Sequence, residues 1–409
     1  MPTLDPLRLT SVQLQNVRDR MGAAILTGLR QPDQEIKALP AFQRRPAPGL
    51  SGRAVALDVG GTHMRAAEVA LDGGTARLLG APRENDLMLR ATGREFTAGE
   101  FFDAQAALIA EVAAAREIIV GYCFSYPATV TPDGGAVLIE WTKGVRIRDV
   151  EGRPVGALLR DALGRRGKIV RAIPVLNDTV ASLLAGAARA PEFARPIGVI
   201  VGTGANMAGF FPVAAMAKLG AEDRRGWRDD DMMAVNLESG DFDPREILTA
   251  WDDALDASLR PEQRGRQRFE KALSGAYLPR LLRAVVGAPA CAAAGFDPDA
   301  PAVDAGTVVA LRDHPQLGEA ATLLLDRSAD LIAAGLAALL HAYAATGPAP
   351  DRAGILVEGS LFHKIPGYPA RVAARLRELA PASAVTFIPN DEQGVPANML
   401  GAASAALAG

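Results

Sequence analysis

The 409-residue sequence has few cysteines, few aromatic residues and no excess of positive charge. Its two cysteines, Cys123 and Cys291, are too few for a disulfide framework, so we expect a reducing cytoplasm. Aromatic residues make up only 5% of the chain, so the core must consist mainly of Leu, Val, Ile and Ala. A net charge of −3 argues against a nucleic-acid partner, which would require a basic face.

Long hydrophobic runs are also missing. Residues 1–20 are polar and charged, without a secretory hydrophobic segment. The most apolar helical stretch, 331–345, contains His341 and is too short to cross a bilayer. We therefore expect no membrane partner. The chain is 49% hydrophobic and 22% charged, and its length predicts two packed domains.

The most informative segment present is VALDVGGTHMR, residues 55–65. Residues 54–57 predict a buried strand and residues 66–71 a second one, so the glycines between them join antiparallel strands. A P-loop would instead run from a strand into a helix. Glycine lets backbone N–H groups approach a phosphate, and hydroxyl and guanidinium groups suit its oxygens. The candidate residues are Asp58, Gly60, Gly61, Thr62 and Arg65. An ordinary Gly-Gly hairpin is the alternative.

The same design recurs in the second half of the chain. Residues 197–201 predict a strand, Gly202, Thr203 and Gly204 a loop, and residues 207–212 a returning strand. The two hairpins lie about one domain apart. They predict two phosphate-facing loops on opposite sides of a cleft.

The remaining segments alternate between helices and strands. Predicted helices cover 4–30, 101–115, 155–163, 178–190, 244–290, 315–345, a segment from about 366, and 395–408. Predicted strands cover 76–79, 117–124, 136–139, 170–176, 234–238, 355–357 and 384–388. Residues 39–49 and 289–301 are rich in Pro, Gly or Ala and are predicted to be loops. The pattern predicts an α/β fold, with ligands beyond the carboxyl ends of the strands.

In their order, the motifs resemble those of the hexokinase family of actin-like sugar kinases. The matching segments are 57–65 (LDVGGTHMR), 124–127 (FSYP), 141–144 (WTKG), 175–180 (VLNDTV), 198–206 (GVIVGTGAN), 235–240 (VNLESG), 269–278 (FEKALSGAYL) and 357–361 (VEGSL). Each motif alone is weak evidence, but eight in family order span nearly the whole chain. The resemblance implies a two-domain actin-like ATPase (ribonuclease H-like) fold with an interdomain cleft. Its small domain would be residues 52–181 plus 393–409, and its large domain residues 1–51 plus 182–392.

The resemblance also implies ATP-dependent phosphorylation of the 6-hydroxyl of glucose or a related hexose. Asp178 would be the general base, taking the proton of the attacking hydroxyl. The alternative is that Asp178 only caps the helix that follows it. Lys143 would also ease charge on the transferring phosphoryl group. The residues implied to bind sugar are Ser125, Thr142, Lys143, Asn177, Asp178, Asn206 and Glu238.

ATP and Mg²⁺ are the implied cofactors. Asp58 would hold Mg²⁺ through water, because Mg²⁺ keeps most of its waters and takes substrate phosphates as ligands. The implied phosphate-binding residues are Gly60, Gly61, Thr62, Arg65, Gly202, Thr203 and Gly204. Gly359 and Ser360 would lie against adenosine.

The sharpest departure from the family is Leu278-Pro279-Arg280, where Leu-Gly-Glu is usual and the Glu binds the sugar near its anomeric end. Arg280 either changes the preferred sugar, by pairing with Glu238 or by donating to a substrate oxygen, or points away from the site. Three other functions are open: a catalytically idle sugar or nucleotide sensor, a kinase for a sugar altered near C1 or C2, and a polymerising actin-like ATPase. A sensor needs no general base, and the sugar-type residues would have no purpose in a polymerising ATPase.

Overall fold

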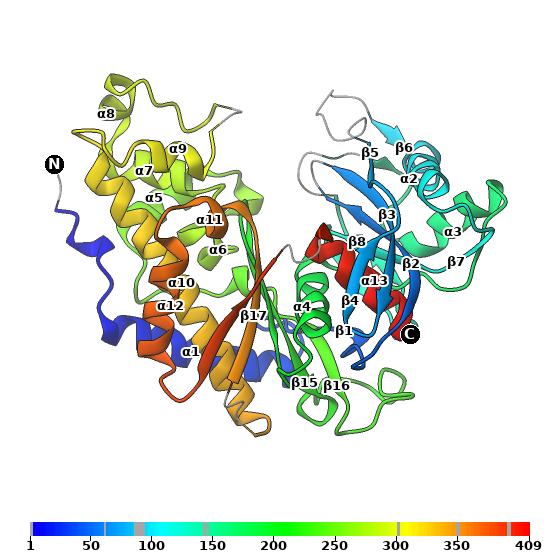
Figure 1. The fold of residues 1–409 in the computed structure, drawn as a ribbon. Coiled ribbons are helices and arrows are strands. Elements are labelled where there is room, and N and C mark those ends of the chain that lie inside the picture. Colours follow the sequence, from blue (N-terminus) through cyan, green and yellow to red (C-terminus); the bar gives the residue numbers. More distant parts are fainter. Residues whose placement is uncertain are drawn as a thin grey trace.

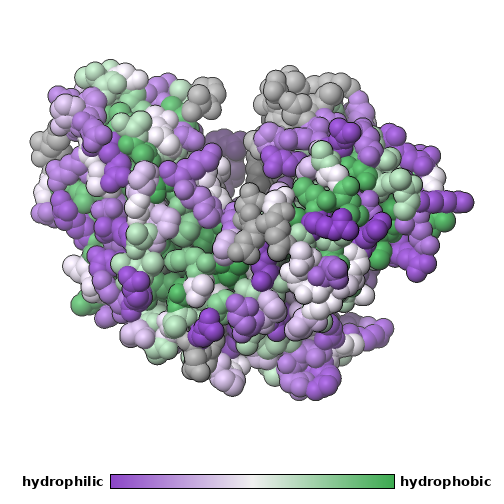
Figure 2. All heavy atoms as spheres, in the orientation of Figure 1, coloured by the Kyte–Doolittle hydropathy of each residue, from purple (hydrophilic) through white to green (hydrophobic). Residues whose placement is uncertain are grey.

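The computed structural model describes residues 3–60, 63–85, 95–141, 145, 147–300, 303–348, 352–390 and 394–409. Two six-stranded sheets lie on either side of helices α4 (Asp178–Arg189) and α13 (Ala397–Ala408) (Figure 1). The space-filling view shows the surface indented at the top, between the two halves that contain these sheets (Figure 2).

The sheet built from the first half of the chain has the order β13-β8-β2-β3-β4, with β5 paired to β3. Its strands are β2 (Gly52–Val59), β3 (Met64–Asp72), β4 (Thr75–Leu78), β5 (Arg83–Asn85), β8 (Val120–Phe124) and β13 (Val175–Leu176). The pairs β2–β3 and β3–β4 are antiparallel, whereas β2–β8 and β8–β13 are parallel.

The second sheet has the order β1-β16-β15-β14-β17-β18. Its strands are β1 (Leu39–Arg44), β14 (Ile197–Val201), β15 (Ala205–Pro212), β16 (Met232–Asn236), β17 (Arg352–Glu358) and β18 (Ala384–Ile388). The pairs β14–β15 and β15–β16 are antiparallel, whereas β14–β17 and β17–β18 are parallel. Strands β16 to β18 therefore repeat the order and directions of β4 to β13. This repeat confirms the α/β actin-like fold.

Short strand pairs and helices complete the described structure. The pairs are β6 (Phe96–Thr97) with β11 (Ile147–Arg148), β7 (Glu117–Ile118) with β12 (Ile169–Val170), and β9 (Ala128–Val130) with β10 (Ala136–Leu138). The other α-helices are α1 (Ser11–Arg30), α2 (Ala98–Val112), α3 (Val155–Arg165), α5 (Ala250–Ser258), α6 (Arg268–Leu273), α7 (Leu278–Val286), α8 (Ala288–Ala293), α9 (Ala305–Ala310), α10 (Gly318–Ala345), α11 (Ser360–Lys364) and α12 (Tyr368–Leu379). The 3₁₀ turns are η1 (Asp5–Leu7), η2 (Val213–Ala215), η3 (Ser239–Asp241) and η4 (Pro261–Gln263).

Helix α4 is packed closely between the two sheets. A Cβ added to Gly198 of β14 would lie 2.4 Å from the backbone N of Leu183 on α4. A Cβ added to Gly401 of α13 would lie 1.9 Å from the carbonyl O of Ala181 on α4. Only glycine allows backbones to approach this closely. Since α13 also packs on β2 and β8, α4 is fixed to one sheet directly and to the other through α13.

Helix α10 forms the centre of the helical layer on the second sheet and packs against α1 and α12. It contains the apolar stretch 331–345, which is buried at nearly every position, so the predicted core helix is confirmed. Within the described residues, no helix is both long and apolar enough to span a membrane.

One predicted loop is wrong. Residues 39–44 form strand β1, which pairs antiparallel with β16. Pro40 cannot donate a backbone hydrogen bond, but β1 lies at the edge of the sheet, where proline is tolerated. The register also shifts between Pro40 and Arg44.

Other differences concern element ends and short elements. The predicted helix 244–290 consists of α5, α6, α7 and part of α8, separated by turns, and α8 also occupies part of the predicted loop 289–301. Helices α9 and α11 were not predicted, because each is too short to show a helical period. The first long helix begins at Ser11 instead of residue 4, because Thr10 and Gln13 form a capping box there. The predicted strand 170–176 consists of two short strands instead. Strand β12 ends at Val170, and β13 begins at Val175.

Candidate active site

The first glycine loop joins β2 to β3 as an antiparallel hairpin, as predicted. The N–H of Gly60 donates to the carbonyl of His63 at 3.0 Å, and the hydroxyl of Tyr126 donates to the carbonyl of Gly60 at 2.8 Å. Gly61 and Thr62 lie outside the described residues. Gly60 is therefore held by two hydrogen bonds at the end of β2.

Arg65 lies opposite Asp58 in the β2–β3 register. Its Nε donates to Oε1 of Glu84 at 3.2 Å, and Nδ1 of His63 lies 2.7 Å from the same oxygen. The side chains of Arg65 and Glu84 are both partly exposed, which leaves Arg65 accessible from the solvent. Phosphate binding by Arg65 stays a prediction, and it would compete with the Glu84 pair.

The second glycine loop lies beside the segment predicted to contact adenosine. The N–H of Gly202 donates to the carbonyl of Gly204 at 2.9 Å, and the side chain of Thr203 is exposed. A Cβ on Gly359 would lie 2.2 Å from the carbonyl O of Val201, so the ends of β14 and β17 are in direct contact. Ser360 is exposed at the start of α11. The structure thus brings together the nucleotide residues predicted from the second half of the chain.

The side chain of Asp58 contacts the last helix of the chain, α13. The amide Nδ2 of Asn398, on α13, donates to Oδ2 of Asp58 at 2.5 Å. Burial raises the pKa of the neighbouring Cys123 thiol well above its ordinary value, and the charge of Asp58 adds to this rise. Asn398 was missed in the sequence, since nothing in a predicted helix distinguishes it from its neighbours.

The predicted start of the helix at residues 177–179 is confirmed. Asn177 is the N-cap of α4, and its Oδ1 accepts the N–H of Thr179 at 2.8 Å. Oδ1 of Asp178 accepts the same N–H at 2.8 Å. Within the described part of the chain, no hydrogen bond reaches Oδ2 of Asp178, so this oxygen is able to accept one. Asn177 is thus the N-cap residue, and Asp178, the first residue of the helix, shares the N–H of Thr179 with it.

The predicted sugar residues of the second sheet form a hydrogen-bonded chain. Nδ2 of Asn206 donates to Oδ1 of Asn236 at 2.7 Å, and Nδ2 of Asn236 donates to Oε1 of Glu238 at 2.7 Å. Burial raises the pKa of Glu238, whereas the Asn236 bond and the charge of Lys37 lower it. Asn236 was missed, although its spacing of two from Glu238 at a strand end indicates the same face.

Three further sugar residues are predicted from the segment that follows β8: Ser125, Thr142 and Lys143. Ser125 is buried, and its N–H donates to the carbonyl of Val59 at 3.1 Å, which places it beside the end of β2. Thr142 and Lys143 lie outside the described residues.

Electrostatic effects show that acidic residues from both sheets face one region. The charge of Asp178 raises the pKa of both Glu238 and Glu358, and the charge of Asp58 raises that of Glu358. Glu358, at the end of β17, was not predicted as a site residue, although an acid at a strand end before Gly-Ser is a detectable signal. The structure therefore gathers Asp58, Asp178 and Glu238 and adds Glu358.

The pKa of Glu358 is raised strongly by its surroundings in the site. Burial raises the pKa of its carboxyl to about 7, and the charges of Asp58 and Asp178 contribute to the rise. The hydroxyl of Ser182, 2.7 Å from Oε2, and the charge of Arg189 act in the opposite direction.

We expect Glu358→Gln to change how stability depends on pH. The folded protein binds the proton of Glu358 more tightly than the unfolded chain, whose Glu pKa is about 4.3. The resulting stabilisation is fully present below about pH 4.3 and is lost as the pH rises through about 7. Relative to the Gln variant, wild type should lose roughly 2–3 kcal/mol of unfolding free energy between about pH 5 and pH 8. Urea unfolding at both pH values measures this, with Glu222→Gln on the surface as control. Parallel pH dependence in wild type and Glu358→Gln would contradict the assignment.

Arg280 does not pair with Glu238. Its Nε donates to Oδ1 of Asp299 at 3.0 Å on the partly exposed side of α7, and Oδ2 of Asp299 takes a second bond from Arg283. Pro279 lies in the first turn of α7, which fixes where Arg280 leaves the helix. The pairing considered from the sequence is thus wrong, and the alternative in which Arg280 points away agrees with the structure.

Comparisons with known proteins identify the family. Two hexokinase family models match the chain, one over residues 2–188 and one over residues 196–296 and 306–408. Human hexokinase-3 is 28% identical over 436 residues, which cover 95% of this chain and 45% of that protein. Hexokinase from Schistosoma mansoni is 31% identical over 296 residues, which cover 69% of this chain and 63% of that protein. The chain thus spans about half to two thirds of the length of these relatives.

Solved structures show the same fold. The Schistosoma mansoni hexokinase complexed with glucose matches with a TM-score of 0.76 at 24% identity, over 98% of this chain and 97% of that one. Another hexokinase crystal structure matches with a TM-score of 0.79 at 25% identity and the same coverage. Together with the two family models, which match most of the sequence, this shows that the chain belongs to the hexokinase family.

Proposed function

We propose that this chain transfers the terminal phosphoryl group of ATP to the 6-hydroxyl of a hexose, with Asp178 as general base. The observation that carries the proposal is the position of Asp178 at the start of α4, between the two sheets. Its charge raises the pKa of Glu238, from the second sheet, and the pKa of the Cys123 thiol, which lies beside Asp58 in the first. A general base must lie within hydrogen-bond reach of the hydroxyl whose proton it takes, and a cleft between the sheets is where that hydroxyl would meet the nucleotide.

The neighbouring residues suit a sugar ligand. Oδ1 of Asp178 is held by the N–H of Thr179, which orients the carboxylate and leaves Oδ2 to accept the proton of the attacking hydroxyl. Glu238 and Asn206 would bind other hydroxyls from the second sheet, and Ser125 and Asn177 from the first. A sugar that lacks a matching hydroxyl would lose one of these hydrogen bonds, which gives selectivity. Thr142 and Lys143 are proposed to complete the site.

The donor set fits Mg²⁺ held mainly by phosphates and water. Asp58 supplies carboxylate oxygen, the ligand type that Mg²⁺ prefers, and Asn398 orients it. Among the described residues, no group of three or more His, Cys, Asp or Glu could hold a metal by itself. A bound Mg²⁺ would neutralise charge on the ATP phosphates. Thr203 and the Gly60 and Gly202 loops would hold those phosphates, and Gly359 and Ser360 the adenosine.

The test is ADP release measured with a panel of hexoses and nucleoside triphosphate donors, with the product identified by its mass. We expect ADP release that depends on the sugar, and a product heavier by one phosphoryl group. The panel includes hexoses altered at C1 or C2, which identifies the preferred sugar. Binding of sugar and ATP without turnover would instead support a catalytically idle sensor.

We further propose that sugar binding closes the cleft between the domains, taken as residues 52–181 plus 393–409 and residues 1–51 plus 182–392. The two phosphate hairpins belong to different sheets, so both can contact one ATP molecule only when the sheets approach. Closure also excludes water from the reaction. Small-angle scattering should show a smaller radius of gyration on adding a sugar that supports turnover. An unchanged radius with that sugar would rule out closure.

A reducing cytoplasm is the proposed location. Cys123 and Cys291 are both free and buried, which agrees with a compartment that does not form disulfides.

A further inference from the structure

Glu270, on α6, contacts the two turns that the proposed function assigns to nucleotide and sugar. Its Oε2 accepts the N–H of Ala205, directly after the Gly202–Gly204 loop, at 2.9 Å. A Cβ added to Gly204 would lie 2.8 Å from the same oxygen, so the loop is packed against the carboxylate. This contact fixes the backbone next to Thr203.

The stem of the same side chain supports the sugar turn. A Cβ added to Gly240, in η3, would lie 3.1 Å from the Cβ of Glu270. Turn η3 begins directly after Glu238, whose backbone has a left-handed conformation with φ of 53°. Displacing Gly240 would therefore displace Glu238.

The residues after Glu270 hold the nucleotide loop at two more points. The N–H of Gly275 donates to the carbonyl of Gly202 at 2.8 Å, and that of Ala276 to the carbonyl of Thr203 at 3.1 Å. Together with the Glu270 bond, these contacts hold three of the four residues from Gly202 to Ala205 against α6 and the turn that follows it.

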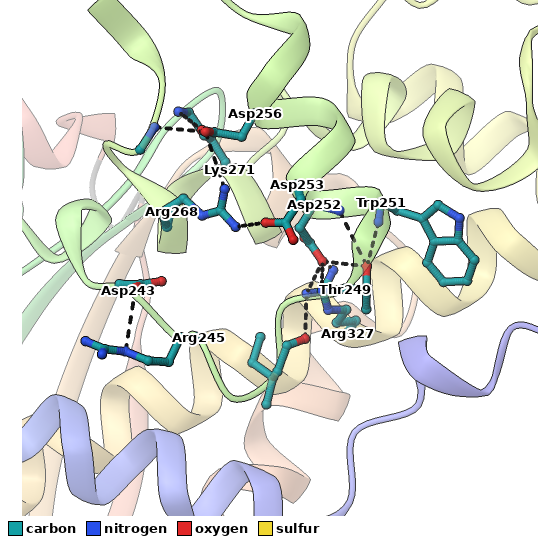
Figure 3. A network of polar contacts seen from close by, with 12 residues as sticks. Asp243, Arg245, Thr249, Trp251, Asp252, Asp253, Asp256, Arg268, Lys271 and Arg327 are labelled. Atoms are coloured by element: carbon teal, nitrogen blue, oxygen red, sulfur yellow. Dashed lines mark hydrogen bonds and ion pairs between the residues drawn. The ribbon is translucent and has the colours of Figure 1, made fainter.

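Helix α6 is itself held in place by ion pairs with α5. Nζ of Lys271 lies 2.6 Å from Oδ1 of Asp256, and Arg268 pairs with Asp253 and Asp256 (Figure 3). Lys271 is buried, so losing Asp256 would leave its ammonium group buried without an ion-pair partner. The helix that carries Glu270 is therefore anchored independently of both turns.

We propose that Glu270 is a positioning residue that couples sugar binding to nucleotide binding, by joining the Gly202–Ala205 loop to the turn that carries Glu238. The inference rests on the proposed function. When a ligand orders one of the two turns, Glu270 limits the movement of the other turn. Sugar and nucleotide should therefore each raise the affinity for the other ligand by the same factor.

Calorimetry with a non-hydrolysable ATP analogue, with and without the sugar that supports turnover, measures this coupling. Glu270→Ala should weaken analogue binding about tenfold, the usual effect of losing a hydrogen bond to a charged group, and should remove most of the increase caused by sugar. Glu270→Gln keeps an acceptor oxygen for the N–H of Ala205 and should restore most of both effects. In steady-state kinetics, the KM for ATP should rise more than kcat falls.

Two further variants keep the test decisive. Glu262→Ala removes an exposed acid from η4 and should change neither affinity nor coupling. Gly240→Ala leaves Glu270 intact but adds a Cβ against its stem, and should reduce the coupling even if Glu270→Ala does not fold. The inference would be overturned if sugar increased the affinity for the analogue as much in Glu270→Ala and Gly240→Ala as it does in Glu262→Ala. A wild-type chain that binds the analogue but no hexose would overturn the proposed function, and the inference with it.

Discussion

Replacement of Asp178 by Asn should lower sugar-dependent turnover by about 10²–10⁴-fold, the usual contribution of a positioned general base. The amide oxygen can still accept the N–H of Thr179, as Oδ1 of Asp178 does at 2.8 Å. Asn177 remains the N-cap of α4. The folded structure and the affinity for ATP should therefore change little, so that the loss appears in kcat.

Asn177→Ala is the matched variant for the alternative explanation. It removes the N-cap, which usually costs about 1 kcal/mol of stability, and leaves the carboxylate of Asp178 in place. If Asp178 acts only as part of the cap, Asp178→Asn should turn over sugar at nearly the wild-type rate. Asn177→Ala should then lose more stability than Asp178→Asn does. Steady-state kinetics and thermal unfolding of both variants distinguish these cases.

Replacement of Arg327 by Met should cost about 3–5 kcal/mol of unfolding free energy. Arg327 is fully buried on α10 and binds both carboxylate oxygens of Asp252 at 3.0 Å (Figure 3). It also donates to the carbonyl of Ile247 at 3.2 Å. The methionine would leave the charge of Asp252 buried with only the N–H and hydroxyl of Thr249 as partners.

Arg280→Met is the surface control, because Arg280 pairs with Asp299 where both side chains are partly exposed. It should cost no more than about 1 kcal/mol. The double variant Arg327→Met with Asp252→Asn removes both charges and should recover part of the loss. Urea unfolding measures all three. Equal losses for Arg327→Met and Arg280→Met would show that burial does not strengthen the inner pair.

The glycine hairpins and the helix start at Asp178 could be predicted because their signals are local. Gly60 and Gly202 each follow a short apolar strand, and Asn177 carries its capping side chain at the helix start itself. Strand β1 was not predictable in the same way. Pro40 disfavours a strand, and only the pairing of β1 with β16, far along the chain, outweighs that preference.

The parts of the site that were missed depend on contacts between distant segments. Asn398 reaches Asp58 only because α13 returns to pack on β2. The pairing of Arg280 with Asp299 depends on the chain after α8, where the sequence has no regular period. The pKa of Glu358 depends on burial and on charges from two other elements, none of which is adjacent in sequence. Local patterns identify candidate residues, whereas their partners follow from the tertiary fold.

In the proposed function, Asp178 directs phosphoryl transfer to the 6-hydroxyl of a hexose. The most direct measurement is the position of the phosphate in the product, read by nuclear magnetic resonance from the coupling between phosphorus and the sugar protons. The corresponding 6-deoxyhexose serves as control. We predict coupling to the protons on C6, no product from the 6-deoxyhexose, and loss of the product with Asp178→Asn. Phosphate on any other oxygen, or full product formation by Asp178→Asn, would contradict it.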